Sequence, residues 1–388
     1  MILHDIKDAF FSEKFWLPPN VTWAAFEDEN YNMPQIRDLW LGIPLAFVIL
    51  LFRKFWERCI AAPIGRMRGV SDKPAKQPAK NSTLEKAFKK HKRMIPDDAD
   101  LEALSKQTDM TVRQIQRWWR LRRSSDKPTE MQRLGESSFR SLMYFILFGM
   151  GVYNLWGEPY IWDTKHCWYN YPMQNVTSAH LWYFCMEIGF YLSLLMSAGT
   201  DNKQKDFWEM MIHHVTSLAM FFISWLGNFV RVAVLTVTLH DCADPLLDAA
   251  KVAKYLNPKY KRLPDIIFVI FTVAWLFSRL IALPLWTGRT SYFEGQEIIG
   301  QYYPAYWLLF SLYALLQILH FYWFTFIVRV IYHYIILKKE LRDTRSDTED
   351  SDSDEDKNKE KKMSHMNGSN SKINGTNGSI GNANNNSK

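Results

Sequence analysis

The chain has 388 residues, of which 48% are hydrophobic and 15% aromatic, and its formal net charge at pH 7 is +7. This composition fits one large domain or a bundle of membrane helices with soluble appendages. The basic excess does not require a nucleic-acid partner, because membrane topology explains most of it, as the distribution of charges along the chain shows.

Apolar runs recur along the chain and decide between the two classes. Most of them are near the roughly 20 residues that span a bilayer, and they occupy residues 39–52, 139–156, 181–198, 210–226, 230–255, 266–286 and 305–337. We therefore predict an all-α polytopic membrane protein with about seven transmembrane helices. The first of these is expected at 39–58.

The charges beside the predicted spans give the expected orientation. Residues 1–38 hold three basic residues against seven acidic ones, whereas three basic residues directly follow the first apolar run, at 53–58. By the positive-inside rule, residues 1–38 lie in the lumen and, after seven spans, the C-terminus lies in the cytosol. The loops predicted to be luminal, 157–180 and 287–303, agree with this, since each holds a single lysine or arginine.

Two sequons fall on the predicted luminal side. Asn20 and Asn175 each begin an Asn-Val-Thr sequence, so we predict glycosylation at both. Of the four cysteines, only Cys167 falls in a predicted luminal loop. We therefore expect no luminal disulfide framework.

A soluble segment at 71–127 follows the first span. It begins with a linker-like stretch, "SDKPAKQPAKNST", and continues with two helical patterns, "DDADLEALSKQ" and "TVRQIQRWWRLRR". We predict a small cytosolic helical module, which resembles the C-terminal two-thirds of a homeodomain. Homeodomains pair an asparagine with adenine, but Leu121 occupies that position here, so we do not expect sequence-specific DNA binding. The arginines of the module are expected to meet phosphates of lipid headgroups or of a nucleotide-bearing substrate, or no specific partner.

A seam of polar residues runs through the fourth and fifth predicted spans. A charge at the centre of a lipid-facing helix costs roughly 2.5 to 3.5 kcal/mol, so Arg231, Asp241 and Asp244 must face the interior, pair with one another or line a wet cavity. Helical spacing places polar residues on one broad face of each span. These residues are His213, Thr216, Ser217, Ser224 and Asn228 on the fourth span, and Asp241, Asp244, Asp248 and Lys251 on the fifth.

The histidines of the seam differ in their expected roles. Adjacent residues point about 100° apart on a helix, so His213 and His214 cannot share a direction. His213 aligns with the serine face and is our candidate for the chemistry, while His214 and His240 are expected to orient or hydrogen-bond neighbours. His320 and His333 are expected to be packing residues in the seventh span.

The stretch "HHVTSLAMFFISWLGNFVRVAVLTVTLHDCADPLLDAAK", residues 213–251, resembles the Lag motif of ceramide synthases. That motif has a double histidine, a serine and an asparagine before an arginine, then His-Asp, a further aspartate and a lysine. "WLPPNVTW", "KDFWEMMIHH" and the acidic serine-bearing tail are also similar to animal ceramide synthases. The resemblance implies that residues 131–340 form a TLC domain, with six spans arranged around a cavity.

The resemblance also implies an activity. Ceramide synthases, in the endoplasmic reticulum membrane, transfer a fatty acyl group from acyl-CoA to the amine of a sphingoid base, which yields ceramide or dihydroceramide. We accordingly expect His213, His214, Asp241 and Asp244 to be catalytic. Supporting or substrate-binding roles are expected for Ser217, Ser224, Asn228, Arg231, His240 and Lys251. We expect no metal and no cofactor, with acyl-CoA as co-substrate and membrane lipids as surroundings, and a homo- or heterodimer is left open.

The sequence leaves the mechanism open. His213 could remove a proton from the amine as general base, or could first take the acyl group as an acyl-imidazole. Asp241 or Asp244 could bind the ammonium group or orient an imidazole. Lys203, Lys205 and Arg262 are candidates for holding the coenzyme A phosphates by location alone. The loop at 287–303, with "TGRTSYFEGQE" at its core, is expected to help set the acyl-chain length.

Three other interpretations compete with this one. The histidines could be packing residues with helix-to-helix hydrogen bonds. A metal-dependent membrane oxidase would need repeated histidine boxes, and only one double histidine occurs. A non-catalytic TLC protein that senses or moves lipids, with the homeodomain-like module as regulator, would be expected to lack the complete motif.

The C-terminal segment, residues 341–388, joins an acidic stretch to a Gly/Asn/Ser-rich end and has no apolar periodicity. We predict a disordered cytosolic tail. Ser346, Ser351 and Ser353 lie beside acidic residues, so we predict that acidophilic kinases phosphorylate them.

Overall fold

The computed structural model describes residues 12–27, 31–73, 76–91, 95–125, 127–199, 201, 205–256 and 262–335. Lys203, the predicted tail at 341–388 and its serines Ser346, Ser351 and Ser353 lie outside these residues. The described residues form helices and connections without a strand. The expectation of an all-α protein is therefore confirmed.

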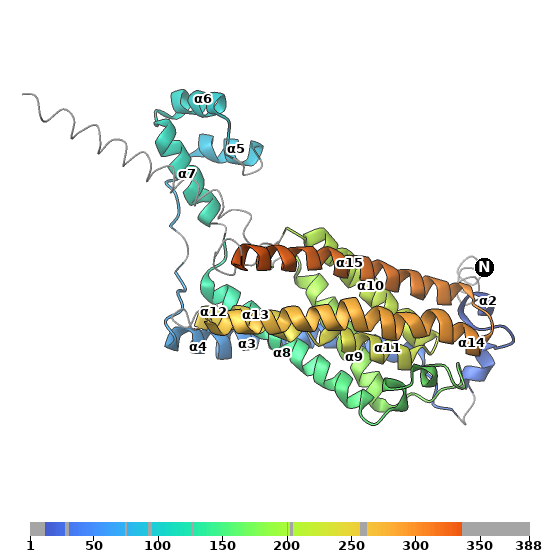
Figure 1. The fold of residues 1–388 in the computed structure, drawn as a ribbon. Coiled ribbons are helices and arrows are strands. Elements are labelled where there is room, and N and C mark those ends of the chain that lie inside the picture. Colours follow the sequence, from blue (N-terminus) through green and yellow to red (C-terminus); the bar gives the residue numbers. More distant parts are fainter. Residues whose placement is uncertain are drawn as a thin grey trace, which may run out of the picture. The chain divides into compact units, whose positions relative to one another are not determined.

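Two compact units are distinguished: Met1–Asn202 with Trp208–Phe324, and Lys203–Phe207 with Thr325–Lys388. Long helices of the first unit lie side by side (Figure 1). They are α3 Gly42–Trp56, α8 Glu130–Leu155, α9 Ser178–Ser197, α10 Phe207–Leu226, α11 Val230–Asp241, α12 Asp244–Leu256, α13 Arg262–Trp275 and α15 Pro304–Ile335. The first residue of α10, Phe207, and the end of α15 from Thr325 belong to the second unit. Shorter elements precede and connect them, namely α2 Glu13–Trp16 and the 3-10 helices η1 Trp23–Glu27, η2 Ile36–Leu41, η4 Pro159–Ile161 and η5 Thr164–Cys167.

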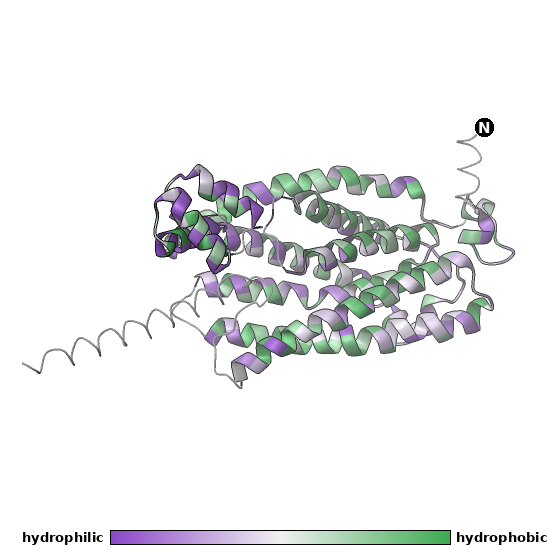
Figure 2. Cartoon of the chain, turned by 90° about the horizontal axis from the view of Figure 1, so that it is seen from above, coloured by the Kyte–Doolittle hydropathy of each residue, from purple (hydrophilic) through white to green (hydrophobic). Residues whose placement is uncertain are grey.

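Four stretches among the described helices are long and apolar enough to cross a membrane, namely Ile36–Met67, Ser178–Ser197, Arg262–Ile299 and Pro304–His333. Apolar side chains are exposed on them, as on α3 at Phe47 and Leu51 and on α13 at Val269, where lipid can cover them. Figure 2 shows this hydrophobic colouring along the long helices. The expected spans at 139–156, 210–226 and 230–255 fall on α8, α10 and α11–α12, which do not meet the same criteria, so the count of seven remains a prediction.

The predicted fifth span is not one helix. α11 ends at Asp241 and α12 begins at Asp244, with a turn at Cys242 and Ala243 between them. Pro245 explains the break, because proline lacks an N–H and its ring clashes with the carbonyl four residues before it, which here belongs to Asp241. The expectation of a continuous helix over 230–255 was wrong.

The expected loop at 287–303 is also largely helical. α13 continues through the π-helices η6 Leu276–Gly288 and η7 Thr290–Glu294 into α14 Gly295–Ile299, and only residues 300–303 connect it to α15. Pro284 lies inside η6. The wide π turn accommodates a proline that would interrupt an ordinary α-helix.

Three short helices form the module predicted at 71–127: α5 Ser82–Lys90, α6 Asp98–Thr108 and α7 Val112–Ser125. The first of these was missed, because part of it was assigned to a linker. The helices share a small core of Leu84, Phe88, Leu101, Leu104, Ile115, Trp118 and Trp119. Arg122 of α7 pairs with Glu85 of α5 at 2.9 Å and holds the pKa of that carboxyl below its usual value.

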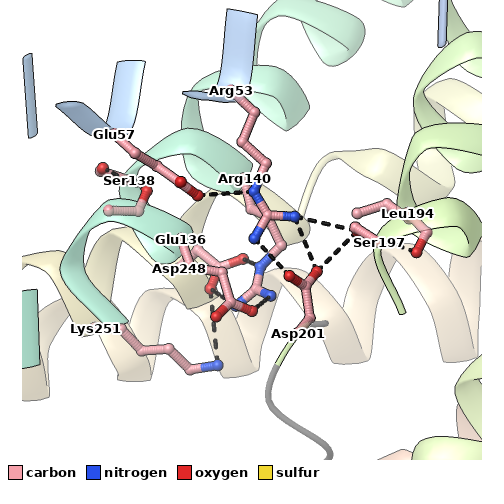
Figure 3. A network of polar contacts seen from close by, with 11 residues as sticks. Arg53, Glu57, Glu136, Ser138, Arg140, Leu194, Ser197, Asp201, Asp248 and Lys251 are labelled. Carbon is pink, nitrogen blue, oxygen red and sulfur yellow. Dashed lines mark hydrogen bonds and ion pairs between the residues drawn. The ribbon is translucent and has the colours of Figure 1, made fainter. Parts of the chain in front are cut away.

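The connections between the long helices meet in two groups. The predicted luminal segments contact each other, since Thr164 bonds Glu294 at 2.6 Å and Asn32 bonds Asn175 at 2.8 Å. Segments predicted to be cytosolic do the same, because Arg53 of α3 pairs with Asp201 at 2.7 Å (Figure 3). All four cysteines are free, and burial raises the pKa of the Cys167 thiol to about 12.

Candidate active site

Three histidines from three helices lie in a row. His213 of α10 stacks on His240 of α11, with ring centroids 5.4 Å apart, and His240 contacts His320 of α15 at 5.1 Å. Ring nitrogens of all three have no hydrogen-bond partner among the described residues. Buried nitrogens without partners are rare outside functional sites, so His320, expected to be a packing residue, joins the site.

An aspartate orients the central imidazole. Nδ1 of His240 lies 2.9 Å from Oδ1 of Asp241. A carboxylate can only accept at that position, so the proton sits on Nδ1 and Nε2 of His240 keeps its lone pair. This is the base-and-orienter arrangement of hydrolase triads, in which the carboxylate stabilises an imidazolium.

Arg279, which the sequence did not single out, is the partner of Asp244, the second aspartate that was expected to be catalytic. Its guanidinium lies 2.5 Å from Asp244, donates to the backbone carbonyl of His240 at 2.8 and 3.0 Å, and stacks 3.9 Å from the Trp275 ring. A lone arginine in the apolar run 266–286 was the available signal, because a charge there needs a buried partner. Arg231, for which such pairing was considered, donates instead to the carbonyl of His166.

Glu187 of α9 is a second residue that sequence reasoning missed. Its side chain is fully buried, and neither of its carboxyl oxygens has a hydrogen-bond partner among the described residues. One oxygen of Asp241 is likewise buried without a partner. Buried carboxyl oxygens without partners are rare outside functional sites, so Glu187 joins the candidate site residues.

Asp248 and Lys251 of the motif belong to a different cluster, drawn in Figure 3. Asp248 pairs with Arg140 of α8 at 3.1 Å and with Lys251 at 3.7 Å, and Arg140 also contacts Glu136. These charges tie α12 to α8. The structure therefore divides the carboxylate stripe of the predicted fifth span between two clusters.

An apolar cavity lies among α10, α11 and α15. His240, His320 and Ser217 are on its wall, together with Ser224 about two turns further along α10. Aromatic side chains, including Trp168, Phe229 and Tyr306, line it as well. His213 precedes Ser217 by about one turn, which places it beside the histidine end of the cavity. His214 is buried next to Tyr191, with ring centroids 5.5 Å apart.

Asn228 lies at the opposite end of α10 from the histidines. Its side chain donates to the carbonyls of Pro172 and Gln174 at 2.7 and 2.8 Å, and its φ of 54° is in the left-handed region that asparagine tolerates. Arg231 likewise bonds the 157–177 connection. These two motif residues hold the turn between α10 and α11 rather than the imidazoles.

One set of side chains has a spacing that a metal ion accepts, since ligand atoms of His240, Asp241 and Asp244 lie within 4.8 Å of one another. Arg279 already neutralises Asp244 there. A cation at this position would face a buried guanidinium, so the residues do not fit a metal site well.

Comparisons with known proteins cover nearly the whole chain. A TLC domain family model matches residues 133–329, and a homeodomain model matches residues 75–128. Ceramide synthase 5 of Homo sapiens is 40% identical over 96% of this chain and 94% of its own length, and ceramide synthase 5 of Mus musculus is 42% identical over 88% and 82%. The chain belongs to the ceramide synthase family.

Distant members of the family align over a similar length, since ceramide synthase hyl-2 of Caenorhabditis elegans is 26% identical over 87% of this chain and 92% of its own. Family membership and the candidate spans identify a multi-pass membrane protein with a TLC domain. The predicted resemblance to ceramide synthases is confirmed.

Proposed function

We propose that this ceramide synthase family member transfers the acyl group of a fatty acyl-CoA to the amine of a sphingoid base. The observation that carries the proposal is the row of imidazoles, one of them paired with Asp241, beside an apolar cavity. A non-catalytic lipid sensor or transporter is not favoured, because the curated relatives over most of the chain are named ceramide synthases.

The cavity suits a fatty acyl chain. Its wall is largely aliphatic and aromatic between Ser217 and Phe229, and burying apolar surface there contributes about 0.8 kcal/mol per methylene. An acyl chain in the cavity would bring its thioester to the histidine end. The reacting carbon then lies near His213, while coenzyme A remains outside the cavity.

The chemistry requires a proton acceptor and a leaving group. The sphingoid amine loses a proton to become a nucleophile, its nitrogen forms a bond to the acyl carbon, and the carbon–sulfur bond breaks, so that coenzyme A leaves as a thiol. In direct transfer, His213 takes the amine proton as general base and passes it to the leaving sulfur. In the acyl-imidazole route, a nitrogen of His213 bonds the acyl carbon as the carbon–sulfur bond breaks, and sulfur takes the proton of the imidazole; the amine then displaces the imidazole and returns a proton to it. Asp241 orients His240 beside His213, and Asp244 and Arg279 fix the backbone at His240.

The general-base route and the acyl-imidazole route predict different intermediates. The full-length protein is incubated with acyl-CoA alone, rapidly quenched and digested, and the peptide that contains His213 is weighed by mass spectrometry. An added acyl mass on that peptide, absent from His213→Ala, supports the covalent route. Ceramide formation without any adduct supports direct transfer, and failure to form ceramide with sphinganine present rejects the proposed function.

We infer that the protein resides in the endoplasmic reticulum membrane with residues 1–38 in the lumen. The exposure of Asn20 and Asn175, which glycosylation requires, supports this orientation. So does the contact between the two predicted luminal segments through Thr164 and Glu294. Glycosidase digestion should increase the mobility of the wild-type protein on gels, and the double variant Asn20→Gln/Asn175→Gln should migrate like the digested form.

A further inference from the structure

Three aromatic rings meet at one end of the cavity. Trp168 comes from the α8–α9 connection, Phe229 precedes α11 and Tyr306 lies in the first turn of α15. Their ring centroids are 5.7 Å apart for Trp168 and Tyr306, 6.4 Å for Trp168 and Phe229, and 5.7 Å for Phe229 and Tyr306. All three are nearly inaccessible to solvent, so together they cover this end of the cavity.

The aromatic end lies opposite the histidine end. Phe229 and His240 both line the cavity and are eleven positions apart around α11, which corresponds to about 16 Å along a helix axis. A straight acyl chain whose thioester lies beside the histidines therefore points its methyl end at these rings.

A buried set of hydrogen bonds fixes the Trp168 ring. Its Nε1 donates to the Thr290 hydroxyl at 2.8 Å, and that hydroxyl donates to Glu294 at 2.7 Å. Thr164 donates to the same Glu294 oxygen at 2.6 Å. We call Thr164, Thr290 and Glu294 the Glu294 clasp. If the indole moved, the buried hydroxyl of Thr290 and the carboxylate of Glu294 would lose hydrogen bonds that no water replaces. The clasp therefore specifies one position for the indole.

The backbone of α14 leaves no free space behind the rings. A Cβ atom added to Gly295 would overlap the Tyr306 hydroxyl and lie 3.2 Å from the Trp168 ring. The rings are thus seated directly against the polypeptide chain, and they cannot retreat to admit a longer acyl chain.

We propose that Trp168 is the stop for the methyl end of the acyl chain, and that the Glu294 clasp fixes its indole ring at the depth where the chain ends. This inference rests on the proposed acyl transfer. The Glu294 clasp gives residues 290–294 an influence on chain length without requiring most of them to touch the substrate, although Ser291 does line the cavity.

The test is a competition among acyl-CoAs. Full-length protein in membranes receives sphinganine and an equimolar series of saturated acyl-CoAs of increasing even length, and the ceramides are quantified by mass spectrometry. Trp168→Ala and Trp168→Phe should shift the products to longer chains, by about fourfold for each methylene that enters the freed space. Thr290→Val, which removes the indole's acceptor, should shift them in the same direction by less.

Two further variants make the test decisive. Trp162 lies in the same connection but is 82% exposed, so Trp162→Ala should leave the distribution unchanged. Ala233 lines the cavity between the histidines and the rings, so Ala233→Leu should shift the products to shorter chains. This variant tests whether the acyl chain occupies the cavity even if Trp168→Ala fails to fold.

The outcomes separate this inference from the proposed function. Active Trp168 variants with a wild-type length distribution would overturn the assignment of Trp168 as the stop. A shift with Trp168→Ala but none with Thr290→Val would overturn the role of the Glu294 clasp. Absence of ceramide from the wild-type protein would instead reject acyl transfer itself.

Discussion

Among single residues, His213 should matter most to catalysis. His213→Ala should lower the rate of ceramide formation by at least about 10²-fold, because loss of a general base or nucleophile has effects of that size. His166→Ala is the control, since that imidazole is in an exposed turn beside Asp163. Turnover of sphinganine and the thermal melting temperature are measured for both variants. If His213→Ala lowers the melting temperature so far that the protein is unfolded in the assay, its loss of activity would be a loss of fold and not of a chemical group.

The buried carboxyl group of Glu187 makes a distinct prediction. Glu187→Gln keeps a polar side chain of the same size and should stay within a few fold of wild-type activity. Glu187→Leu removes every hydrogen-bonding atom at this buried position, and its kcat should fall by at least about tenfold, since a polar group lost from a buried site costs about 1–3 kcal/mol. Equal activity of the two variants at equal stability would contradict a role for the polar group of Glu187.

The sequence could predict the motif residues but not all of their neighbours. His213, Asp241 and Asp244 stand out because they combine strong polarity with regular spacing in apolar helices. Glu187 and Arg279 are single charged residues in otherwise apolar runs. No second polar residue at helical spacing indicates which way either side chain points. Only the packing of α9 and η6 against α11 shows what each one faces.

At the scale of elements, the break between α11 and α12 should be needed for activity. Pro245→Ala removes the cause of the break, so a helix that continues through residues 242 and 243 would turn Asp244 away from Arg279. We expect lower turnover with little loss of expression. Ser141→Ala, which removes only the hydrogen bond to the Pro245 carbonyl, is the control. A fully active Pro245→Ala protein would show that the break is not required.

The helical module offers a pH-dependent prediction. Because Arg122 lowers the pKa of Glu85, the pair stabilises the module above the ordinary glutamate pKa and loses this effect as the pH falls through the lowered value. Glu85→Gln should therefore reduce stability near neutral pH by less than about 1 kcal/mol, as for other partly exposed pairs. The difference between variant and wild type should vanish in acid, which chemical denaturation at two pH values would reveal.

Elements were predicted best where a pattern is long. The apolar runs that became α9, α13 and α15 were recognisable from composition alone. The helical course of residues 287–299 was not, because the glycines and threonines there indicate a loop, and the π-helices η6 and η7 depend on packing that the sequence does not display.

At the scale of the whole molecule, catalysis should depend on the membrane domain and little on the module. Deleting residues 75–125 should reduce ceramide formation far less than His213→Ala does, because none of the described site residues lies in the module. The measurement is specific activity normalised to protein level. A deletion as inactive as His213→Ala, yet normally folded, would assign the module a direct part in the reaction.

The motif has two ends with different duties, and this affects how natural variants should be interpreted. The histidines are proposed to serve the reaction, whereas Asn228 holds the turn that joins α10 to α11 by bonding Pro172 and Gln174. Loss of Asn228 should therefore lower the amount of protein, because cellular quality control removes misfolded molecules, while the molecules that remain keep their activity. Loss of His213 should leave the amount of protein unchanged and remove its activity. Carriers of the first kind of variant would respond to agents that aid folding, and carriers of the second would not.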